Sequence, residues 1–352
     1  MIDTSKGRGQ RYEHSRRSTT QKEGEKIPST SYPATKTVVV IQATQKIKTF
    51  TTNTVPEPSL NPSGTQTSAK PKQKTQNIVS NDLTRLKFTS APEILVRPPS
   101  EFRNCWLNDI LLLSGDRLLL NDISTRTLKI IDLKTSSLTS EVNVPGMPWG
   151  MCHIPGDKVA ICVSQSIQFL EKRGKLFLGK NIKVDSDCRG VGYHNGNLII
   201  SFESGNVQKI NMEGKVLATI STSSFKNPWH LKVVGDDQTA AIYVSDFEMC
   251  TITKLDMNLI TLETFKDPAL RKPLGITAVG NQLIICGWLS HNIMCLDLQS
   301  GNMTELLGMV EGIASPKIVC YSLQQNKMYV AVFENGDANN YVKVYNTTPK
   351  WN

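Results

Sequence analysis

Short apolar and polar runs alternate between residues 105 and 346, and their pattern recurs about every 40 to 45 residues. Each copy contains two apolar strands followed by two strands in which apolar and polar residues alternate. The six copies open at Cys105, Pro148, Cys188, Pro228, Pro273 and Ser315. Continuous apolar runs are typical of strands covered on both faces, while alternation indicates strands with one exposed face. Six copies of four strands predict an all-β, six-bladed β-propeller.

The ring needs a way to close, because the sixth copy has almost no chain after Tyr345 for an outermost strand. Residues 86–97 carry apolar side chains at Leu86, Phe88, Ile94 and Val96, and we expect them to supply that strand. Closure of this kind removes the unpaired edges that an open sheet would expose. The propeller is therefore expected to span residues 83–347, with residues 348–352 as a C-terminal tail.

The N-terminal part has a different composition. Residues 1–80 hold 13 of the 40 basic residues but only 5 of the 31 acidic ones, so they carry nearly all of the net charge of +9. They are rich in Ser, Thr, Lys, Gln and Pro, and they have too few apolar residues to offset the entropy lost on folding. We predict a disordered basic tail over residues 1–82. Its charge suits nonspecific contact with nucleic acid or an anionic surface, and a solvated linker is the simpler interpretation.

The expected cellular compartment depends on targeting signals, and none is visible in the sequence. The first residues are polar and lack the apolar stretch of a secretory signal, and no run is long enough to span a membrane. A reducing compartment is expected, cytoplasmic or alternatively nuclear, in which the eight cysteines stay reduced. Most of them lie inside apolar runs and none forms a C-x-x-C pair, so we interpret them as small core residues rather than metal ligands.

The fifth copy resembles a known repeat. Its order of Pro-x-Gly-Ile-x-x-Val at 273–279, a turn, the apolar strand 283–286, a second turn and Asn-x-Ile after residue 291 is similar to NHL repeats. Residues 86–346 as a whole resemble the C-terminal propeller of TRIM-like (TRIM-NHL) proteins. That resemblance implies a module of ubiquitin ligases or of RNA-binding regulators. The chain lacks the paired Cys and His residues of RING and B-box zinc sites and a coiled-coil heptad, so ligase chemistry is not expected in it.

A partner-binding face is expected where the loops before the innermost strands meet the turns after the second strands. Four tryptophans map to these loops, and Arg189, His230 and His291 are expected beside the rings on the same face. Exposed aromatic rings next to Arg or His are typical binding anchors. The alternative is that the rings cap the central channel and pack between blades. The candidate residues are Trp106, Trp149, Arg189, Trp229, His230, Trp288 and His291, whereas the fifth tryptophan, Trp351, falls in the C-terminal tail.

Two other interpretations compete with protein binding: a cation site formed by carboxylates and a calcium-dependent hydrolase. Carboxylates recur near the end of the second strand, at Asp122, Glu203, Asp246 and Glu334, and recurrence at a turn favours a turn-stabilising role over a cation site. Propellers resembling gluconolactonases and paraoxonases hold calcium with oxygen ligands on the axis. Here Asn108 and Asp109 are the one adjacent polar pair at such a place, and no Ser, His and Asp set has the spacing of a triad.

The sequence therefore predicts a non-enzymatic, protein-binding propeller without a cofactor or a metal. RNA binding ranks second. It would require several basic residues to gather on one side of the propeller, namely Arg126, Arg189, Lys226, Arg271 and Lys272. Calcium-dependent hydrolysis is the third. The identity of the partner and the oligomeric state are not encoded in any motif of the chain.

Overall fold

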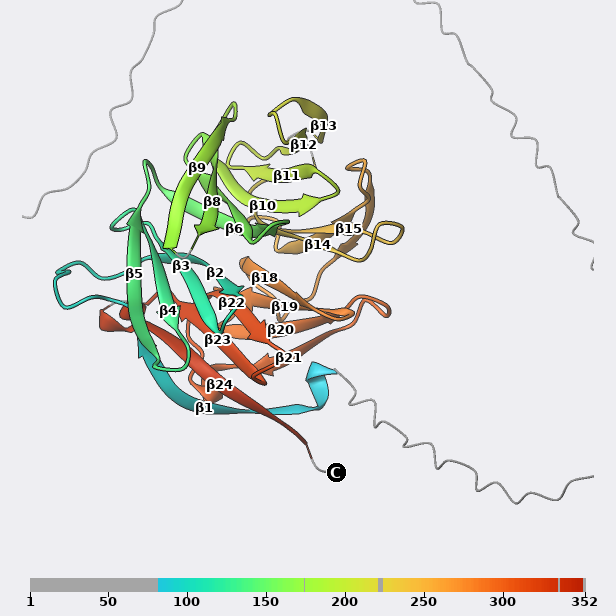
Figure 1. Cartoon of the computed structure of the whole chain (residues 1–352). Coiled ribbons are helices and arrows are strands. Elements are labelled where there is room, and N and C mark those ends of the chain that lie inside the picture. The colour runs from blue at the N-terminus through green and yellow to red at the C-terminus, as the bar shows by residue number, and fades with distance from the viewer. Residues whose placement is uncertain (1–81, 174, 221–223, 335, 351–352) are drawn as a thin grey trace, which may run out of the picture. The chain divides into compact units, whose positions relative to one another are not determined.

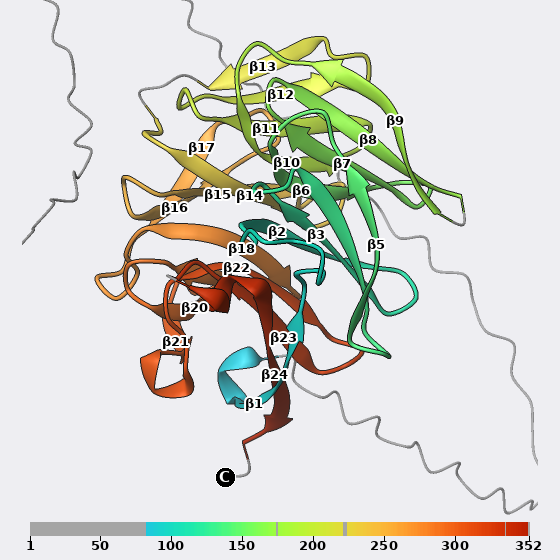
Figure 2. The same ribbon diagram turned by 90° about the vertical axis from the view of Figure 1, so that its left-hand side faces the viewer.

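The computed structural model describes residues 82–173, 175–220, 224–334 and 336–350. These residues form six four-stranded antiparallel sheets, which stand as blades around a common axis (Figures 1 and 2). The predicted all-β, six-bladed propeller is confirmed. The tail predicted over residues 1–82 lies outside the described residues except for Asp82, and so does Trp351. None of the described residues forms a helix that is long and apolar enough to cross a membrane.

Each blade is built from strands consecutive in the chain, except that the sixth takes its outer strand from the N-terminal end of the fold. The innermost strands are β2 (Leu107–Leu113), β6 (Pro148–Ile154), β10 (Cys188–His194), β14 (Pro228–Val234), β18 (Pro273–Val279) and β22 (Pro316–Ser322). The second strands are β3 (Arg117–Asp122), β7 (Lys158–Val163), β11 (Asn197–Phe202), β15 (Ala241–Asp246), β19 (Gln282–Gly287) and β23 (Lys327–Val332). The third strands are β4 (Thr127–Asp132), β8 (Ser166–Arg173), β12 (Val207–Asn211), β16 (Thr251–Leu255), β20 (Asn292–Asp297) and β24 (Tyr341–Pro349). The outermost strands are β5 (Ser137–Asn143), β9 (Lys175–Lys183), β13 (Val216–Ile220), β17 (Thr261–Phe265), β21 (Met303–Leu307) and β1 (Leu86–Leu95). Three short 3-10 helices complete the described elements: η1 (Leu83–Arg85), η2 (Met309–Glu311) and η3 (Asp337–Asn340).

The N-terminal and C-terminal ends of the fold meet in one sheet. β1 pairs antiparallel with β24 along its whole length, with Leu86 opposite Pro349 and Leu95 opposite Tyr341. The predicted closure of the ring by residues 86–97 is thereby confirmed, and Figure 2 shows the two strands side by side. β24 continues to Pro349, two residues beyond the end expected at 347, because Leu86 extends the pairing that far.

The core lies between blades rather than in one central mass. Apolar side chains of neighbouring sheets pack face to face, as Ile284 of β19 does with Val319 of β22 in one cluster and Leu118 of β3 with Ile318 in the next. This two-sided burial explains the continuous apolar runs of the inner strands. Seven of the eight cysteines are buried in it as free thiols, and Cys250 is half-buried.

All six innermost strands share a β-bulge close to their first residue. The pairing with the second strand shifts by one residue at the same place in every blade. A bulge leaves a residue outside the ladder and redirects its side chain. In four blades the strand starts with Pro, which has no N–H to lose from the ladder. The register also corrects two predicted starts, because the first and sixth copies begin at Leu107 and Pro316 rather than at Cys105 and Ser315.

Candidate partner-binding site at the channel mouth

The six bulges place one side chain per blade around one end of the axis. The equivalent residues are Asn108, Trp149, Arg189, Trp229, Leu274 and Lys317. A second circle comes from the residues that follow the second strands, each of which donates its N–H to a carbonyl just before the innermost strand of its own blade. These are Ile123, Ser164, Glu203, Phe247, Trp288 and Phe333. We call the two circles, together with Trp106, the channel mouth.

Aromatic rings form an almost continuous chain around the channel mouth. Trp149 meets Trp229 edge-on with ring centroids 5.4 Å apart, and Phe247 lies 5.8 Å from both Trp229 and Trp288. On the other side, Trp106 stacks on Phe333 at 4.9 Å. Such pairs are stabilising beyond the area they bury, so the rings hold one another in place.

The rings enclose a small pocket of about 130 Å³. It is lined by Trp106, Trp229, Phe247, Leu274, Trp288, Lys317 and Phe333, which come from four blades. Sites for drug-sized ligands usually measure roughly 300–1,000 Å³. The pocket therefore has room for about one amino-acid side chain and not for a large cofactor.

Lys317 is the charged group of the pocket. Its side chain is 5% exposed, and its ammonium lies 4.9 Å from the ring centroid of Trp106 and 5.3 Å from that of Phe333. Among the described residues it has no hydrogen-bond or ion-pair partner. Burial, reinforced by the nearby charge of Arg189, holds the pKa of Lys317 well below its usual range, although Asp122 acts in the opposite direction.

Arg189 lies between two tryptophans on the opposite side of the mouth. Its guanidinium carbon is 3.6 Å from the ring centroid of Trp149 and 4.9 Å from that of Trp229. One terminal nitrogen pairs with Glu203 at 2.7 Å, while Nε and Nη1 are buried without a partner. This arrangement joins three blades and leaves two donors unused.

Directly below the mouth, a histidine and a carboxylate meet across the axis. His230 Nε2 of the fourth blade lies 3.2 Å from Asp109 Oδ2 of the first, and both side chains are buried. His230 Nδ1 accepts from the N–H of Ile276, so Nε2 carries the proton that it donates to Asp109. Asp109 also accepts from the N–H groups of Ile110 and Met151. The Asp109 carboxylate is thus already filled with N–H donors, and the oxygen cluster that a calcium-dependent hydrolase needs is not formed by the described residues here.

The seven residues nominated from the sequence therefore separate into four groups. Trp106, Trp229 and Trp288 line the pocket, whereas Trp149 and Arg189 pack at its edge and between blades. His230 lies below them on the axis. His291 is engaged elsewhere, since its Nδ1 accepts from the N–H of Ser315 and links a turn of the fifth blade to the start of the sixth.

The recurring carboxylates do not converge on one point. Asp122 accepts from the N–H groups of Trp106 and Ser124, and Asp246 accepts from those of Lys226, Asn227, Glu248 and Met249, so both hold turns. Glu203 pairs with Arg189 instead. The turn-stabilising interpretation thus holds for Asp122 and Asp246.

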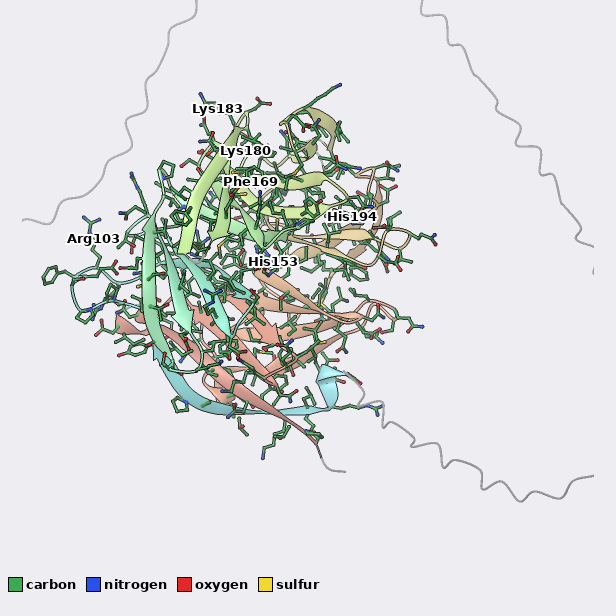
Figure 3. The ribbon with its side chains drawn as sticks, in the orientation of Figure 1. Arg103, His153, Phe169, Lys180, Lys183 and His194 are labelled. Carbon is green, nitrogen blue, oxygen red and sulfur yellow. The ribbon has the colours of Figure 1, made fainter. Side chains whose placement is uncertain are left out.

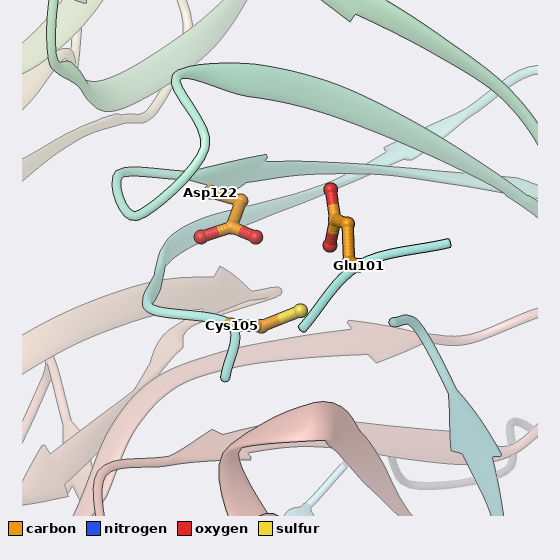
Figure 4. A group of neighbouring side chains, drawn as sticks. All are labelled: Glu101, Cys105 and Asp122. Carbon is orange, nitrogen blue, oxygen red and sulfur yellow. The ribbon is translucent and has the colours of Figure 1, made fainter. Parts of the chain in front are cut away.

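Glu101, Cys105 and Asp122 form one group with the composition of a metal site (Figure 4). The buried Lys129 ammonium neutralises the carboxylates of this group. It lies 2.9 Å from Glu101, 3.6 Å from Asp122 and 2.8 Å from the neighbouring Glu141. Burial alone would lower the pKa of Lys129, but its hydrogen bonds to Glu141 and Glu101 outweigh burial and raise it. Burial and the Asp122 charge raise the pKa of the Cys105 thiol, so this group is best described as a buried ion-pair network.

Other charged and histidine residues lie away from the mouth. Lys180 of β9 extends over the ring of Phe169 at 5.6 Å on the outer part of the second blade, and His153 of β6 lies near the middle of the ring (Figure 3). His153 Nε2 is 2.9 Å from the carbonyl oxygen of Leu112. Of the basic residues considered for RNA, Arg189 and Lys272 are paired with Glu203 and Glu248. Their positive charges are thus partly neutralised.

Sequence reasoning missed three important residues of the pocket: Phe247, Lys317 and Phe333. Lys317 follows Pro316 as Trp149 follows Pro148, a correspondence that is lost if the sixth copy opens at Ser315. Phe247 and Phe333 each follow a second strand, at the place where Trp288 was recognised. Aligning the copies on the proline finds Lys317, and aligning them on the end of the second strand finds the two phenylalanines.

Comparisons with known proteins extend only to the fold. No family model matches the chain, and no curated protein matches its sequence. A catalytically inactive variant of virginiamycin B lyase from Staphylococcus aureus, solved with quinupristin, is 14% identical with a TM-score of 0.54, covering 71% of this chain and 83% of that one. A streptogramin B lyase is 11% identical with a TM-score of 0.56, covering 76% and 99%. A protein of unknown function from Bacteroides thetaiotaomicron is also 11% identical at 0.56, covering 75% and 76%. At these identities the similarity shows a shared six-bladed propeller fold and no shared function.

Proposed function

We propose that this chain is a binding module that holds a segment of a partner protein at the channel mouth. The observation that carries the proposal is the pocket of about 130 Å³ in which aromatic rings from several blades surround a buried lysine. Aromatic anchors next to a cation are frequent hot spots of protein interfaces. The volume suits one inserted side chain, and the exposed edge of Trp106 offers further contact area.

A catalytic role finds less support from the described residues. The axial Asp109 and His230 are buried and bonded to each other and to backbone N–H groups. They lie below the pocket rather than lining it. The lyase activity named for two similar structures is therefore not carried over to this chain.

The finer assignment, a recognition propeller of the TRIM-like type, is part of the same proposal. It is supported by the Pro-x-Gly-Ile order at 273–276 and by the six-bladed fold. In that role the propeller selects a protein partner, and the ligase chemistry belongs to another domain or another protein.

Proximity labelling in cells tests the proposal with the whole chain as bait. Partners enriched by the wild type should be lost with the double substitution Trp229→Ala and Trp288→Ala, because the pocket loses two of its walls. Ile260→Ala with Leu262→Ala is the matched control, since these apolar side chains are exposed at and just before the outer strand β17. Both variants must keep the circular dichroism spectrum of the wild type.

Two results would contradict protein binding at the mouth. One is that the wild type and the tryptophan variant enrich the same proteins. The other is that crosslinked RNA is the main product, which would favour the RNA-binding alternative.

A further inference from the structure

Buried polar atoms without a partner gather at the channel mouth. Six of the eight such side-chain atoms in the described residues belong to Asn108, Arg189, Asn227 and Trp288, all in or next to the two circles. Buried polar groups are almost always hydrogen-bonded in folded proteins, and each exception calls for a physical reason. Their concentration at one end of the axis indicates that a ligand completes these hydrogen bonds.

The unused groups are mostly donors. Arg189 offers Nε and Nη1, Trp288 offers its indole N–H, and Lys317 adds an ammonium that faces the pocket. Asn108 contributes one donor and one acceptor, and Asn227 contributes an acceptor. The group that fits this set is a hydrogen-bond acceptor with negative charge.

A second buried lysine shows how unusual Lys317 is. Lys129 is equally buried, and three carboxylates lie within 4 Å of its ammonium. Lys317 has the rings of Trp106 and Phe333 and no ion-pair partner among the described residues. Burying a charge without an opposite charge is costly, so the missing anion is the part that a partner would supply.

We infer that the mouth pocket binds an acidic segment of the partner protein, inserting a carboxylate next to an apolar side chain, with Lys317 as the counter-ion. The aromatic walls receive the apolar group, and the indole N–H of Trp288 is available to the carboxylate. This inference rests on the proposed function and specifies the chemistry of the segment that is bound.

Three small probes of similar shape test the charge preference on the whole chain: phenylacetate, benzyl alcohol and phenethylamine. Their binding is followed by the NMR signals of the tryptophan indole N–H groups. Phenylacetate should bind about tenfold or more tightly than the other two, because a hydrogen bond to a charged group is worth more than one to a neutral group. The preference should disappear in Lys317→Met and in Lys317→Gln. It should persist in Lys272→Met, which removes a positive charge already paired with Glu248 at 2.6 Å.

The outcomes separate this inference from the proposed function. Equal binding of the three probes, tighter binding of the amine, no binding at all, or an unchanged preference in both Lys317 variants would overturn the acidic-segment assignment. The proposed function is judged on a different measurement, the loss of labelled partners in the tryptophan variant, and it can stand with an apolar segment if the charge preference fails.

Discussion

At the scale of single residues, the two buried lysines differ in how their charges are neutralised. Lys129 is surrounded by Glu101, Glu141 and Asp122, so its charge is compensated inside the fold. The Lys317 ammonium lies against two aromatic rings, and the Asp122 charge acts on it without forming an ion pair. A protein that leaves one ammonium in this state loses some stability in exchange for a site that attracts an anion.

Substitution of the two lysines should therefore change the free energy of unfolding in opposite directions. Lys317→Met should stabilise the free protein by about 1 kcal/mol or more, because it removes an uncompensated buried charge. Lys129→Met should destabilise it by about 3–5 kcal/mol, because it leaves the buried Asp122 carboxylate and the partly exposed Glu101 and Glu141 without their cation. Urea unfolding near neutral pH measures both. Destabilisation by Lys317→Met would contradict the description of that charge as a cost.

The same prediction has a pH dependence with a definite sign. Because the folded state lowers the pKa of Lys317 below its unfolded value, the unfolded chain binds more protons between the two values. Wild-type stability should therefore rise relative to Lys317→Met as pH increases through that alkaline window, with Arg189 and Asp122 as the charged groups facing the lysine. Parallel stability curves for the two proteins would show that Lys317 titrates normally.

At the scale of elements, closure by β1 is the contact most distant in sequence. β1 pairs with β24 over nearly its whole length, and Leu83 just before it is buried, with its N–H bonded to Gln282. Without β1 the sixth blade would present β24 as an open edge.

A chain that starts at residue 97 should accordingly lose its cooperative thermal unfolding or form oligomers through the free edge of β24. A chain that starts at residue 82 is the control, since it keeps η1 and β1. Size-exclusion chromatography and thermal unfolding distinguish the two. A monomeric, cooperatively unfolding chain from residue 97 would show that β1 is dispensable.

The element scale also shows what could be read from the sequence. The number of blades, the four-strand order and the closing strand were predictable, because alternation and repeat length depend on local pattern alone. The pairing register of the innermost strands was harder to predict from the sequence. Trp106 after Cys105 imitates Trp149 after Pro148, yet the pairing of Leu107 with Asp122 places Asn108 in the equivalent position.

The contacts of the site could not be predicted, since they join blades far apart in sequence. His230 bonds to Asp109 across the axis, while Gly150, Gly190 and Gly275 occupy the equivalent place in three other blades. A Cβ at Gly275 would lie 2.4 Å from Ile318 Cδ1, and one at Gly150 would lie 2.7 Å from the Arg189 carbonyl oxygen. The inner strands can approach closely only without those side chains. The separation of His291 from the pocket depends on a turn conformation that the pattern of apolar residues does not encode.

At the scale of the whole molecule, six similar blades present different side chains at one end of the axis. Bulges at the same place in every blade bring different side chains into a circle, so the scaffold repeats while the chemistry varies from blade to blade. Repeat proteins commonly place their binding surface on such variable positions. On the proposed function, a partner protein should therefore contact the channel mouth and not the outer strands.

Site-specific photocrosslinking in cells tests that claim most directly. A photoreactive amino acid replaces Leu289, which is exposed in the turn after Trp288, or replaces Leu262 on the outer strand β17 as the control. Binding at the channel mouth should give discrete crosslinked protein adducts from position 289. These adducts should be lost when Trp229→Ala is added and should be absent from position 262. The same adducts from both positions, or adducts from position 262 alone, would contradict binding at the channel mouth.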